Sequence, residues 1–368
     1  MDAFWRLMWY ALFIPDIFSM KELPEEYFEI HGRNTLFVNG FSLYSLISNM
    51  TVENIYYTLG NEFVIWSTYT LKEYAGFMLY PLTLIGILII LYYPLVFFLF
   101  LLYVYNAILL VWKKIGNLPE DINSQEWDKP KQFLALAAEW HGKILHSYEI
   151  SGLENLPKEP AIFVYYHGPI PIDHYFFIHK ILRLTGKPFY SVMDHIVFHL
   201  PGLHMCRLFH YAVHPTREKS VNILKQGHQL MVSPGGLREQ NYGNNHYKII
   251  WWNRKGFAHI AIDAKVPIIP VFTQNIREGY VTFGNIRPMR WLYERTRWIT
   301  FPLYGMFPVK LISHIGKPIP YDPDITPEKL AEKTQRAMEA LRDKHQKIPG
   351  SILQAIRQRF ERCNKDKQ

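Results

Sequence analysis

The chain has 368 residues, 49% of them hydrophobic and 16% aromatic, which excludes a disulfide mini-protein and a disordered chain. Its 40 Lys and Arg against 32 Asp and Glu give a net charge of +8, which suits an anionic membrane surface or a phosphate-bearing ligand, and we expect no nucleic-acid partner. Cys206 and Cys363 form no CxxC motif, so neither a disulfide framework nor a thiolate metal site is expected.

Residues 1–75 form an amino-terminal region of uncertain role. Within it, residues 3–18 contain only a short apolar stretch, broken by Pro15, and no small-residue cleavage site. They are therefore predicted to be a retained, interfacial segment and not a cleaved signal peptide. Residues 19–71 carry no motif that we can interpret.

Residues 76–112 contain no Asp, Glu, Lys or Arg. One bilayer crossing takes about 20 apolar residues, so this run predicts two short transmembrane helices. Pro94, near the midpoint, disrupts the helical hydrogen bonds, and we expect the two helices to meet there as a hairpin. One tilted, kinked span is the alternative. Lys113 and Lys114 place the following domain in the cytosol by the positive-inside rule.

Residues 116–368 form a predicted globular domain in which strands and helices alternate. Three continuous apolar runs predict buried strands, at residues 161–166, 228–233 and 266–272. Prolines in the third run indicate an edge strand or a strand terminus. Helices are predicted at residues 172–185 and 256–264, and Thr326 and Pro327 begin a helical tail. This alternation indicates an α/β domain whose ligands bind beyond the strand ends.

His167 directly follows the first strand, where α/β enzymes place their chemistry. Six residues later stands Asp173, and one straight helix would not bring the two side chains to the same face. Pro169 and Pro171 keep the intervening segment out of helix, so the turn can fold back and bring the carboxylate to the imidazole. Such a pair would be a general base suited to removing a hydroxyl proton. The alternative is a strand-end histidine bonded to backbone and an aspartate that caps the helix.

A second candidate site follows the strand at residues 228–233. Pro234, Gly235 and Gly236 form a tight turn that permits close approach of backbone N–H groups to a ligand oxygen. Arg238 and Glu239 follow and could grip phosphate or polar groups. The alternative is an ordinary turn. Neither a nucleophile elbow nor a P-loop motif is present here.

Together these motifs resemble the glycerolipid acyltransferase superfamily. The shared order is a Gly-Leu-Glu-Asn-Leu-Pro phrase at 152–157, a strand, the His and Asp pair, an arginine segment around Arg217, the Pro-Gly-Gly turn and a Val-Pro-Ile-Ile-Pro strand. The resemblance covers about residues 145–325, and it is most specific to the transmembrane protein 68 family.

The resemblance implies transfer of a fatty acyl group, with acyl-CoA as the expected donor, at the endoplasmic reticulum. It implies His167 as base and Asp173 as its partner, although five residues separate them here and four in most of the superfamily. Substrate binding is expected from the arginine segment and the turn, at Arg217, Pro234, Gly235, Gly236, Arg238 and Glu239. The Pro-Gly-Gly turn favours a neutral acceptor such as mono- or diacylglycerol over a lysophospholipid. No cofactor or metal is implied.

Two other classes of function are weaker alternatives. Eight histidines lie between positions 167 and 214, and His195 and His199 have the spacing of a helical metal pair, as in membrane di-iron oxidases. No His-His pair or HExxH motif supports this. An inactive lipid-binding scaffold is the other. For an enzyme, we expect an apolar groove from the membrane to His167 that uses some of Phe176, Phe177, Phe189, Tyr190, Phe198 and Phe209, unless these are plain core.

Overall fold

A computed structural model of the protein describes residues 52–121, 124–296 and 303–361. The chain divides into two units, Met1–Thr83 and Leu84–Gln368. The described part of the first unit is the beginning of the helix α4 (Val52–Gly116). The predicted interfacial segment at 3–18 lies outside the described residues.

The apolar run at 76–112 lies within α4, a single helix of 65 residues, and not in a hairpin. The hairpin prediction is wrong in this respect, and the stretch of α4 long and apolar enough to cross a membrane is Phe77–Gly116. Pro94 lacks the backbone N–H but supplies no chain reversal, and no Gly, Asn or Asp accompanies it to form a turn. A long helix can absorb the loss of one hydrogen bond.

The second unit is built on a mixed sheet of seven strands in the order β1-β9-β6-β2-β5-β3-β4. All neighbouring pairs are parallel except β6 and β9. Two short strands, β7 and β8, form a separate antiparallel pair. The bounds are β1 (Glu149–Ser151), β2 (Ile162–Tyr165), β3 (Phe189–Val192), β4 (Ala212–Val213), β5 (Gln229–Val232), β6 (Ile268–Gln274), β7 (Tyr280–Thr282), β8 (Leu303–Gly305) and β9 (Ile312–Ile315).

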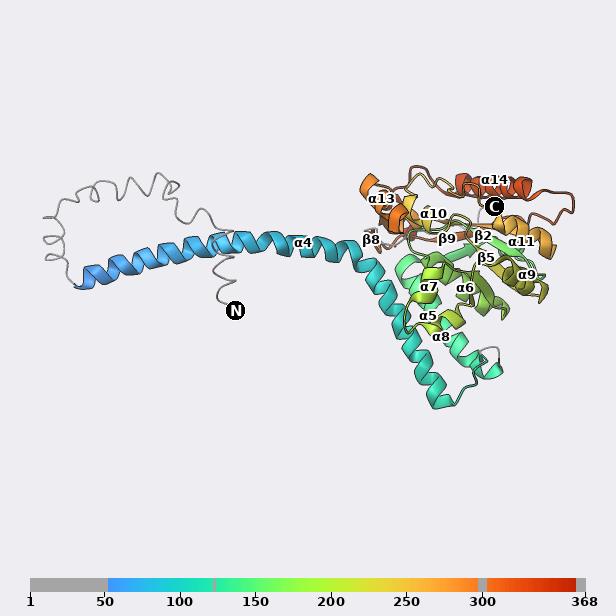
Figure 1. Ribbon diagram of the computed structural model, residues 1–368, viewed down its shortest axis with the longest axis horizontal. Coiled ribbons are helices and arrows are strands. Elements are labelled where there is room, and N and C mark those ends of the chain that lie inside the picture. The colour runs from blue at the N-terminus through green and yellow to red at the C-terminus, as the bar shows by residue number, and fades with distance from the viewer. Residues whose placement is uncertain (1–51, 122–123, 297–302, 362–368) are drawn as a thin grey trace. The chain divides into compact units, whose positions relative to one another are not determined.

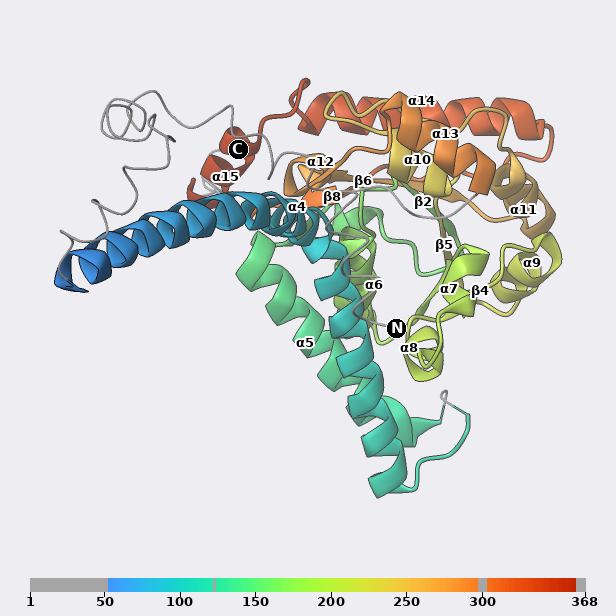
Figure 2. The same cartoon turned by 60° about the vertical axis from the view of Figure 1, so that its left-hand side comes forward.

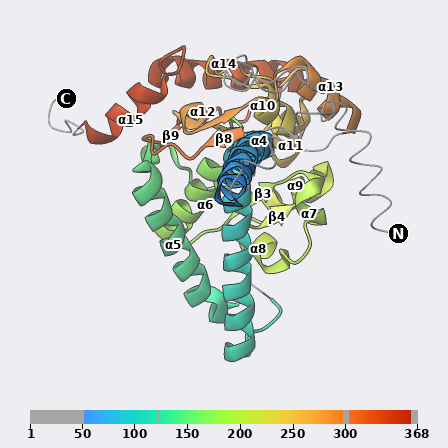
Figure 3. The ribbon, with the colours of Figure 1, turned by 90° about the vertical axis from the view of Figure 1, so that its left-hand side faces the viewer.

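Helices cover both faces of this sheet: Figure 3 shows α14 on one side of it and α5 and α6 on the other, an arrangement also seen in Figure 1 and Figure 2. The helices are α5 (Asp128–His146), α6 (Ile172–Thr185), α7 (His195–His199), α8 (His204–Phe209), α9 (Arg217–Lys225), α10 (Gly236–Tyr242), α11 (Gly256–Ala264), α12 (Ile276–Gly279), α13 (Arg287–Thr296), α14 (Pro327–His345) and α15 (Ile352–Phe360). Two 3-10 turns, Gln125–Trp127 and Leu153–Asn155, complete the described elements.

The local signals for α6, α11 and α14 are confirmed. The helix α6 ends at Gly186, whose φ of 68° is the left-handed conformation that glycine tolerates. In α14 the Thr326 hydroxyl accepts a hydrogen bond from the Lys329 N–H at 3.4 Å, with Pro327 at the first helical position.

Of the two alternatives for the proline-containing strand, the edge position is wrong, because β6 is flanked by β9 and β2. The terminus fits Pro267, which directly precedes β6, but not Pro270, which lies inside it. On the β9 side, the pairs Val271–Ile315 and Ile268–Ile319 are three residues apart on one strand and four on the other, which is a β-bulge. Pro270 lies at this irregularity, and its carbonyl accepts from the Gly316 N–H at 2.8 Å. An interior strand therefore accommodates the missing N–H.

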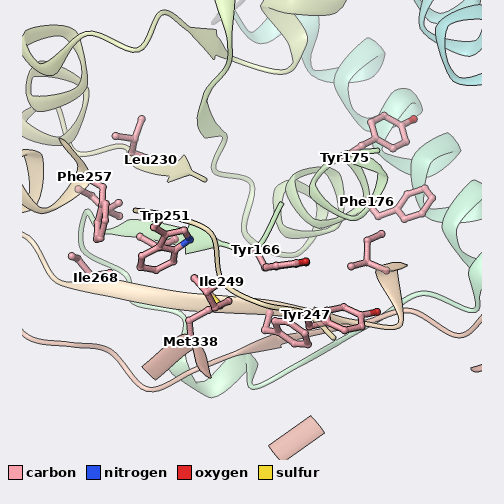
Figure 4. Close-up of a cluster of buried hydrophobic side chains, with 14 of the residues drawn as sticks. Tyr166, Tyr175, Phe176, Leu230, Tyr247, Ile249, Trp251, Phe257, Ile268 and Met338 are labelled. Atoms are coloured by element: carbon pink, nitrogen blue, oxygen red, sulfur yellow. The ribbon is translucent and has the colours of Figure 1, made fainter. Parts of the chain in front are cut away.

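Both sides of β2 are buried, which explains its uninterrupted apolar sequence. Phe163 packs with Phe177 of α6 on one side, in a core cluster of its own. Ile162 belongs to the larger cluster on the other side, part of which is drawn in Figure 4 with Phe257 and Met338. Closely packed layers on both sides fix the strand ends that carry the candidate site.

Candidate functional site

Three adjacent strands, β5, β2 and β6, are parallel, so their carboxyl ends lie at the same edge of the sheet. His167 follows β2, the turn of Pro234, Gly235 and Gly236 follows β5, and α12 with Arg277 follows β6. The tertiary structure thus brings the first and second predicted motifs together and adds a third segment.

His167 is oriented by its own turn. Its ring Nδ1 lies 2.8 Å from the carbonyl oxygen of Gly168. Because a carbonyl can only accept, Nδ1 carries the proton and Nε2 is left with its lone pair. Among the described residues no hydrogen bond to Nε2 is found. A residue larger than glycine would clash at position 168, because a Cβ there would lie 2.4 Å from Cγ1 of Ile276.

Burial lowers the pKa of His167 to about 4. The bond to the Gly168 carbonyl opposes this shift, the charge of Arg277 adds to it, and the charge of Asp194 opposes it. The ring is therefore neutral at pH 7 and able to accept a proton at Nε2.

Asp173 does not hydrogen-bond His167 in the structure. It lies in the first turn of α6, 2% exposed, and no described residue forms a hydrogen bond with its Oδ1. Burial raises the pKa of Asp173 to about 6, while a hydrogen bond to the Thr273 side chain opposes the shift. The expectation that the turn folds the carboxylate back onto the imidazole is thus not met, because the Gly168 carbonyl occupies Nδ1.

Glu239 is fully buried and faces the backbone of the neighbouring loops. Its Oε2 accepts the N–H of His167 at 2.9 Å, and its Oε1 accepts the N–H of Ile250 at 2.9 Å. Burial raises the pKa of Glu239 to about 7, against the effect of these two bonds and of the Arg277 and Arg254 charges. Both carboxylate oxygens are engaged inside the protein, so the residue is not free to grip a substrate as the sequence suggested.

The glycine turn is held by Arg254, whose Nη1 donates to the carbonyls of Pro234 and Gly235, both at 3.0 Å. Gly236 has a φ of 49°, in the left-handed region. Gly235 is small for another reason, since a Cβ there would lie 2.4 Å from Cβ of Glu239. The first glycine therefore makes room for a buried carboxylate.

The two predicted arginines differ in position. Arg217 begins α9 and forms a two-pronged ion pair with Asp263 of α11, at 2.6 and 2.7 Å, in a region separate from α10 in Figure 1 and Figure 2. Arg238, in α10 beside the glycine turn, pairs with Glu294 at 3.2 Å and lies over the ring of Trp252. Of the two, only Arg238 adjoins the other predicted residues.

The predicted aromatic groove is largely core. Four of its six candidate residues are at most 4% exposed and pack inside the hydrophobic core clusters, namely Phe176, Phe177, Phe189 and Phe209. Of the candidate metal pair, His199 in α7 uses Nδ1 on the carbonyl of His195 at 2.8 Å. Among the described residues no group of three or more His, Cys, Asp and Glu side chains could hold a metal ion.

Comparison with known proteins assigns the chain to a family. The model of the family described as Acyltransferase matches residues 147–274. A Bos taurus protein named "DGAT1/2-independent enzyme synthesizing storage lipids" is 47% identical over 298 residues, 81% of this chain and 88% of its own. The Homo sapiens protein of the same name is 47% identical over 79% of this chain and 90% of its own. The chain belongs to this family of acyltransferases.

A solved structure with a similar chain is the 1-acyl-sn-glycerophosphate (LPA) acyltransferase PlsC from Thermotoga maritima. It aligns with a TM-score of 0.42 and 18% identity, over 67% of this chain and 96% of that one.

The acyltransferase match, residues 147–274, includes His167 and the glycine turn and ends just before Arg277. Sequence reasoning missed this arginine. The signal was present, because Arg277 and Glu278 are charged residues just beyond a buried strand, the position that drew attention to His167.

Proposed function

We propose that this acyltransferase transfers a fatty acyl group from acyl-CoA to the hydroxyl of mono- or diacylglycerol, with His167 as general base. The observation that carries the proposal is the neutral imidazole with its proton on Nδ1 and a free lone pair on Nε2. As the acceptor oxygen attacks the thioester carbonyl, its proton passes to Nε2. The tetrahedral intermediate then expels the CoA thiolate, which takes up that proton, so no acyl-enzyme forms.

A neutral acceptor is supported by two observations. The relatives are named for the synthesis of storage lipids. The Pro234-Gly235-Gly236 turn is the version that resembles enzymes acting on neutral glycerides. A lysophospholipid is the second candidate acceptor, and the experiment below separates the two.

We place the enzyme on the endoplasmic reticulum membrane through α4. Between Phe77 and Tyr93 no described side chain of α4 is buried, and at 1.5 Å per residue this stretch is about 25 Å long, close to the hydrocarbon thickness of a bilayer. From Pro94 onward one side of the helix packs on the catalytic domain, where Leu109 is 1% exposed. Lys113 and Lys114, at its end, favour the cytosolic side for that domain.

The outer side of this second half of α4 is apolar, and α5 beside it also exposes large apolar side chains. Trp112 and Phe133 are in edge-to-face contact, with ring centroids 5.5 Å apart. Large exposed side chains on the two helices include Val96, Phe100, Val111, Phe133, Trp140 and Ile144. An exposed apolar surface of this kind fits lipid, and it would keep the domain against the bilayer.

Phe97, Phe98 and Leu101 of α4 face Ile170, in the loop that follows His167, and Ile172, at the start of α6, across a narrow apolar crevice. An acyl chain held along this apolar surface would stay out of water between the bilayer and the base, which avoids the cost of about 0.8 kcal/mol per CH₂ exposed to water.

The test is acyl transfer by the purified full-length protein in liposomes. Radiolabelled acyl-CoA is offered with monoacylglycerol, diacylglycerol or a lysophospholipid, and the products are separated. We expect labelled di- or triacylglycerol from the wild type and no measurable product from His167→Ala, because a general base contributes about 10²- to 10⁴-fold. Equal activity of the two proteins would refute the proposal. A labelled phospholipid as the product would show that the acceptor is a lysophospholipid and not a neutral glyceride.

A further inference from the structure

Arg277 is buried at the carboxyl end of β6, only 4% exposed. Its Nε donates to the hydroxyl of Tyr166 at 2.9 Å, and its Nη1 donates to the carbonyls of Gln240 and Gly243 at 3.0 and 3.1 Å. Its Nη2 donates to two further carbonyls, so all five N–H groups of the guanidinium are used. No ion pair of this arginine with a carboxylate is found among the described residues. The group is therefore employed in holding loops.

The two carbonyls bound by Nη2 are those of His167, at 3.1 Å, and Glu239, at 2.5 Å. The carboxylate of Glu239 in turn accepts the N–H of His167. These bonds close a ring of three residues in which both backbone polar groups of the base are engaged. The other oxygen of Glu239 ties the ring to Ile250.

Two glycines leave the space that these side chains fill. A Cβ on Gly243 would lie 2.1 Å from Nη2 of Arg277, and a Cβ on Gly235 would lie 2.4 Å from Cβ of Glu239. Neither residue has a positive φ, so backbone conformation does not demand glycine at either place. Glycine is required at these two positions because the side chains of Arg277 and Glu239 occupy the space that a Cβ would need.

We propose that Arg277 and Glu239 are positioning residues, which hold the main chain of His167 so that its ring meets the acceptor hydroxyl. This rests on the proposed function of His167 as base. Positioning matters because displacement of a reacting group by about 1 Å can cost on the order of 10²-fold in rate. A buried ion is a poor source of stability by itself, since its desolvation offsets the bonds that it makes.

The charge state of Glu239 adds a pH dependence. Two arginines face it, Arg277 from α12 and Arg254 from the loop before α11. Two tyrosines face it as well, Tyr165 at the end of β2 and Tyr166 directly after that strand. A carboxylate can accept both the His167 and Ile250 N–H bonds, whereas a protonated acid loses acceptor capacity on one oxygen. Burial raises the pKa of Glu239 to about 7, so the hydrogen bonds that hold the main chain of His167 should weaken as pH falls through neutrality.

The experiment measures kcat and KM of the full-length enzyme in liposomes across pH 5.5 to 8.5, for the wild type, Arg277→Lys and Glu239→Gln. Lysine keeps the charge but has three donors in place of a five-donor fork. Glutamine matches the size of the glutamate but accepts through one oxygen only. We expect kcat to fall about 10- to 100-fold in each, with KM within about two-fold. The wild-type acid limb near pH 7 should be absent in Glu239→Gln.

Arg359→Lys is the matched control. The Arg359 guanidinium also donates to backbone carbonyls, those of Leu145 at 2.6 Å and Pro308 at 3.3 Å, but it touches neither His167 nor Glu239. We expect its kcat and pH profile to equal those of the wild type. Melting temperatures of all variants report folding, and if Arg277→Lys does not fold, the near-isosteric Glu239→Gln decides.

A folded Glu239→Gln with unchanged kcat, or one that keeps the acid limb near pH 7, would overturn the positioning role. The positioning role would also be overturned if activity fell only in proportion to the amount of folded protein, in these variants and in Arg359→Lys alike. Activity of His167→Ala equal to that of the wild type would instead refute the proposed function, and this result is read independently of the other variants.

Discussion

The Nδ1 of His167 donates to the carbonyl oxygen of Gly168, the next residue in the chain, at 2.8 Å. A backbone carbonyl thus fixes the tautomer that a carboxylate was expected to fix. Asp173 is buried and forms no hydrogen bond to the ring, and one of its oxygens has no partner in the described part of the chain. This relationship separates the roles of the two residues and makes them separately testable.

Asp173→Asn should reduce kcat much less than His167→Ala, by less than about 10-fold against the 10²- to 10⁴-fold expected for a lost base. The reason is that the imidazole keeps its Gly168 partner in the variant. Parallel kinetics of the two variants in liposomes measure this. A loss in Asp173→Asn as large as that in His167→Ala would mean that the carboxylate reaches the ring during turnover.

Asp173→Asn should also change the pH dependence of stability. The pKa of Asp173 is about 6 in the folded protein, above its ordinary value of 3.8, so the folded state binds this proton more tightly than the unfolded state. Its contribution to the free energy of unfolding therefore falls as pH rises from about 4 to 6, by about 3 kcal/mol for a shift of about two units.

Thermal unfolding of the wild type and Asp173→Asn at pH 4.5 to 7.5 checks this. The melting temperature of the wild type should fall relative to that of the variant as pH rises. Glu239 and Glu278 titrate in the same range in both proteins, so the difference between the two curves isolates Asp173. Parallel curves would contradict the prediction.

Gly235→Ala should lower both kcat and the melting temperature, because the added methyl would overlap the side chain of Glu239. Gly256→Ala is the matched control, since no neighbouring group of the described residues lies within 4 Å of a Cβ at that position. Circular dichroism melts and initial rates on the two variants decide the matter. Equal behaviour of both would show that the turn adjusts without cost.

Arg238→Ala should raise the KM for acyl-CoA about 10-fold, as expected for loss of a charge-assisted contact to phosphate beside the glycine turn. Arg217→Ala should leave that KM within about two-fold, because Arg217 pairs with Asp263 in a region separate from the glycine turn. Initial rates over a range of acyl-CoA concentrations measure both. An unchanged KM in both variants would point to a different acyl donor, such as a phospholipid.

Leu109→Ala and Leu110→Ala distinguish the two sides of α4. Leu109 is 1% exposed and packs on the catalytic domain, whereas Leu110 is 49% exposed. Loss of the buried side chain should destabilise the detergent-solubilised protein by about 2–5 kcal/mol, and loss of the exposed one by about 0.5 kcal/mol or less. Chemical unfolding of both variants measures the difference. Equal destabilisation would mean that this part of α4 does not pack as described.

Much of the fold and part of the site could be predicted locally. The boundaries of α6 and α11 follow from Gly186 and from hydrophobic periodicity, and His167 stands out because a titratable residue directly after a buried strand has few structural uses. Arg277 satisfies the same rule after β6 but was missed. Its significance depends on carbonyls far away in the chain, and no local pattern indicates which loops they belong to.

By itself, the sequence determined the α/β alternation, the position of His167 at a strand end and the presence of an apolar segment of membrane length, because periodicity, capping and composition act within a few residues. Only the tertiary structure decided which side of α4 meets protein, that β6 is internal, and that Glu239 faces the backbone of His167. Composition records that a residue is apolar or charged, but not what it faces. That depends on contacts between segments distant in sequence, which packing of the whole sheet brings together.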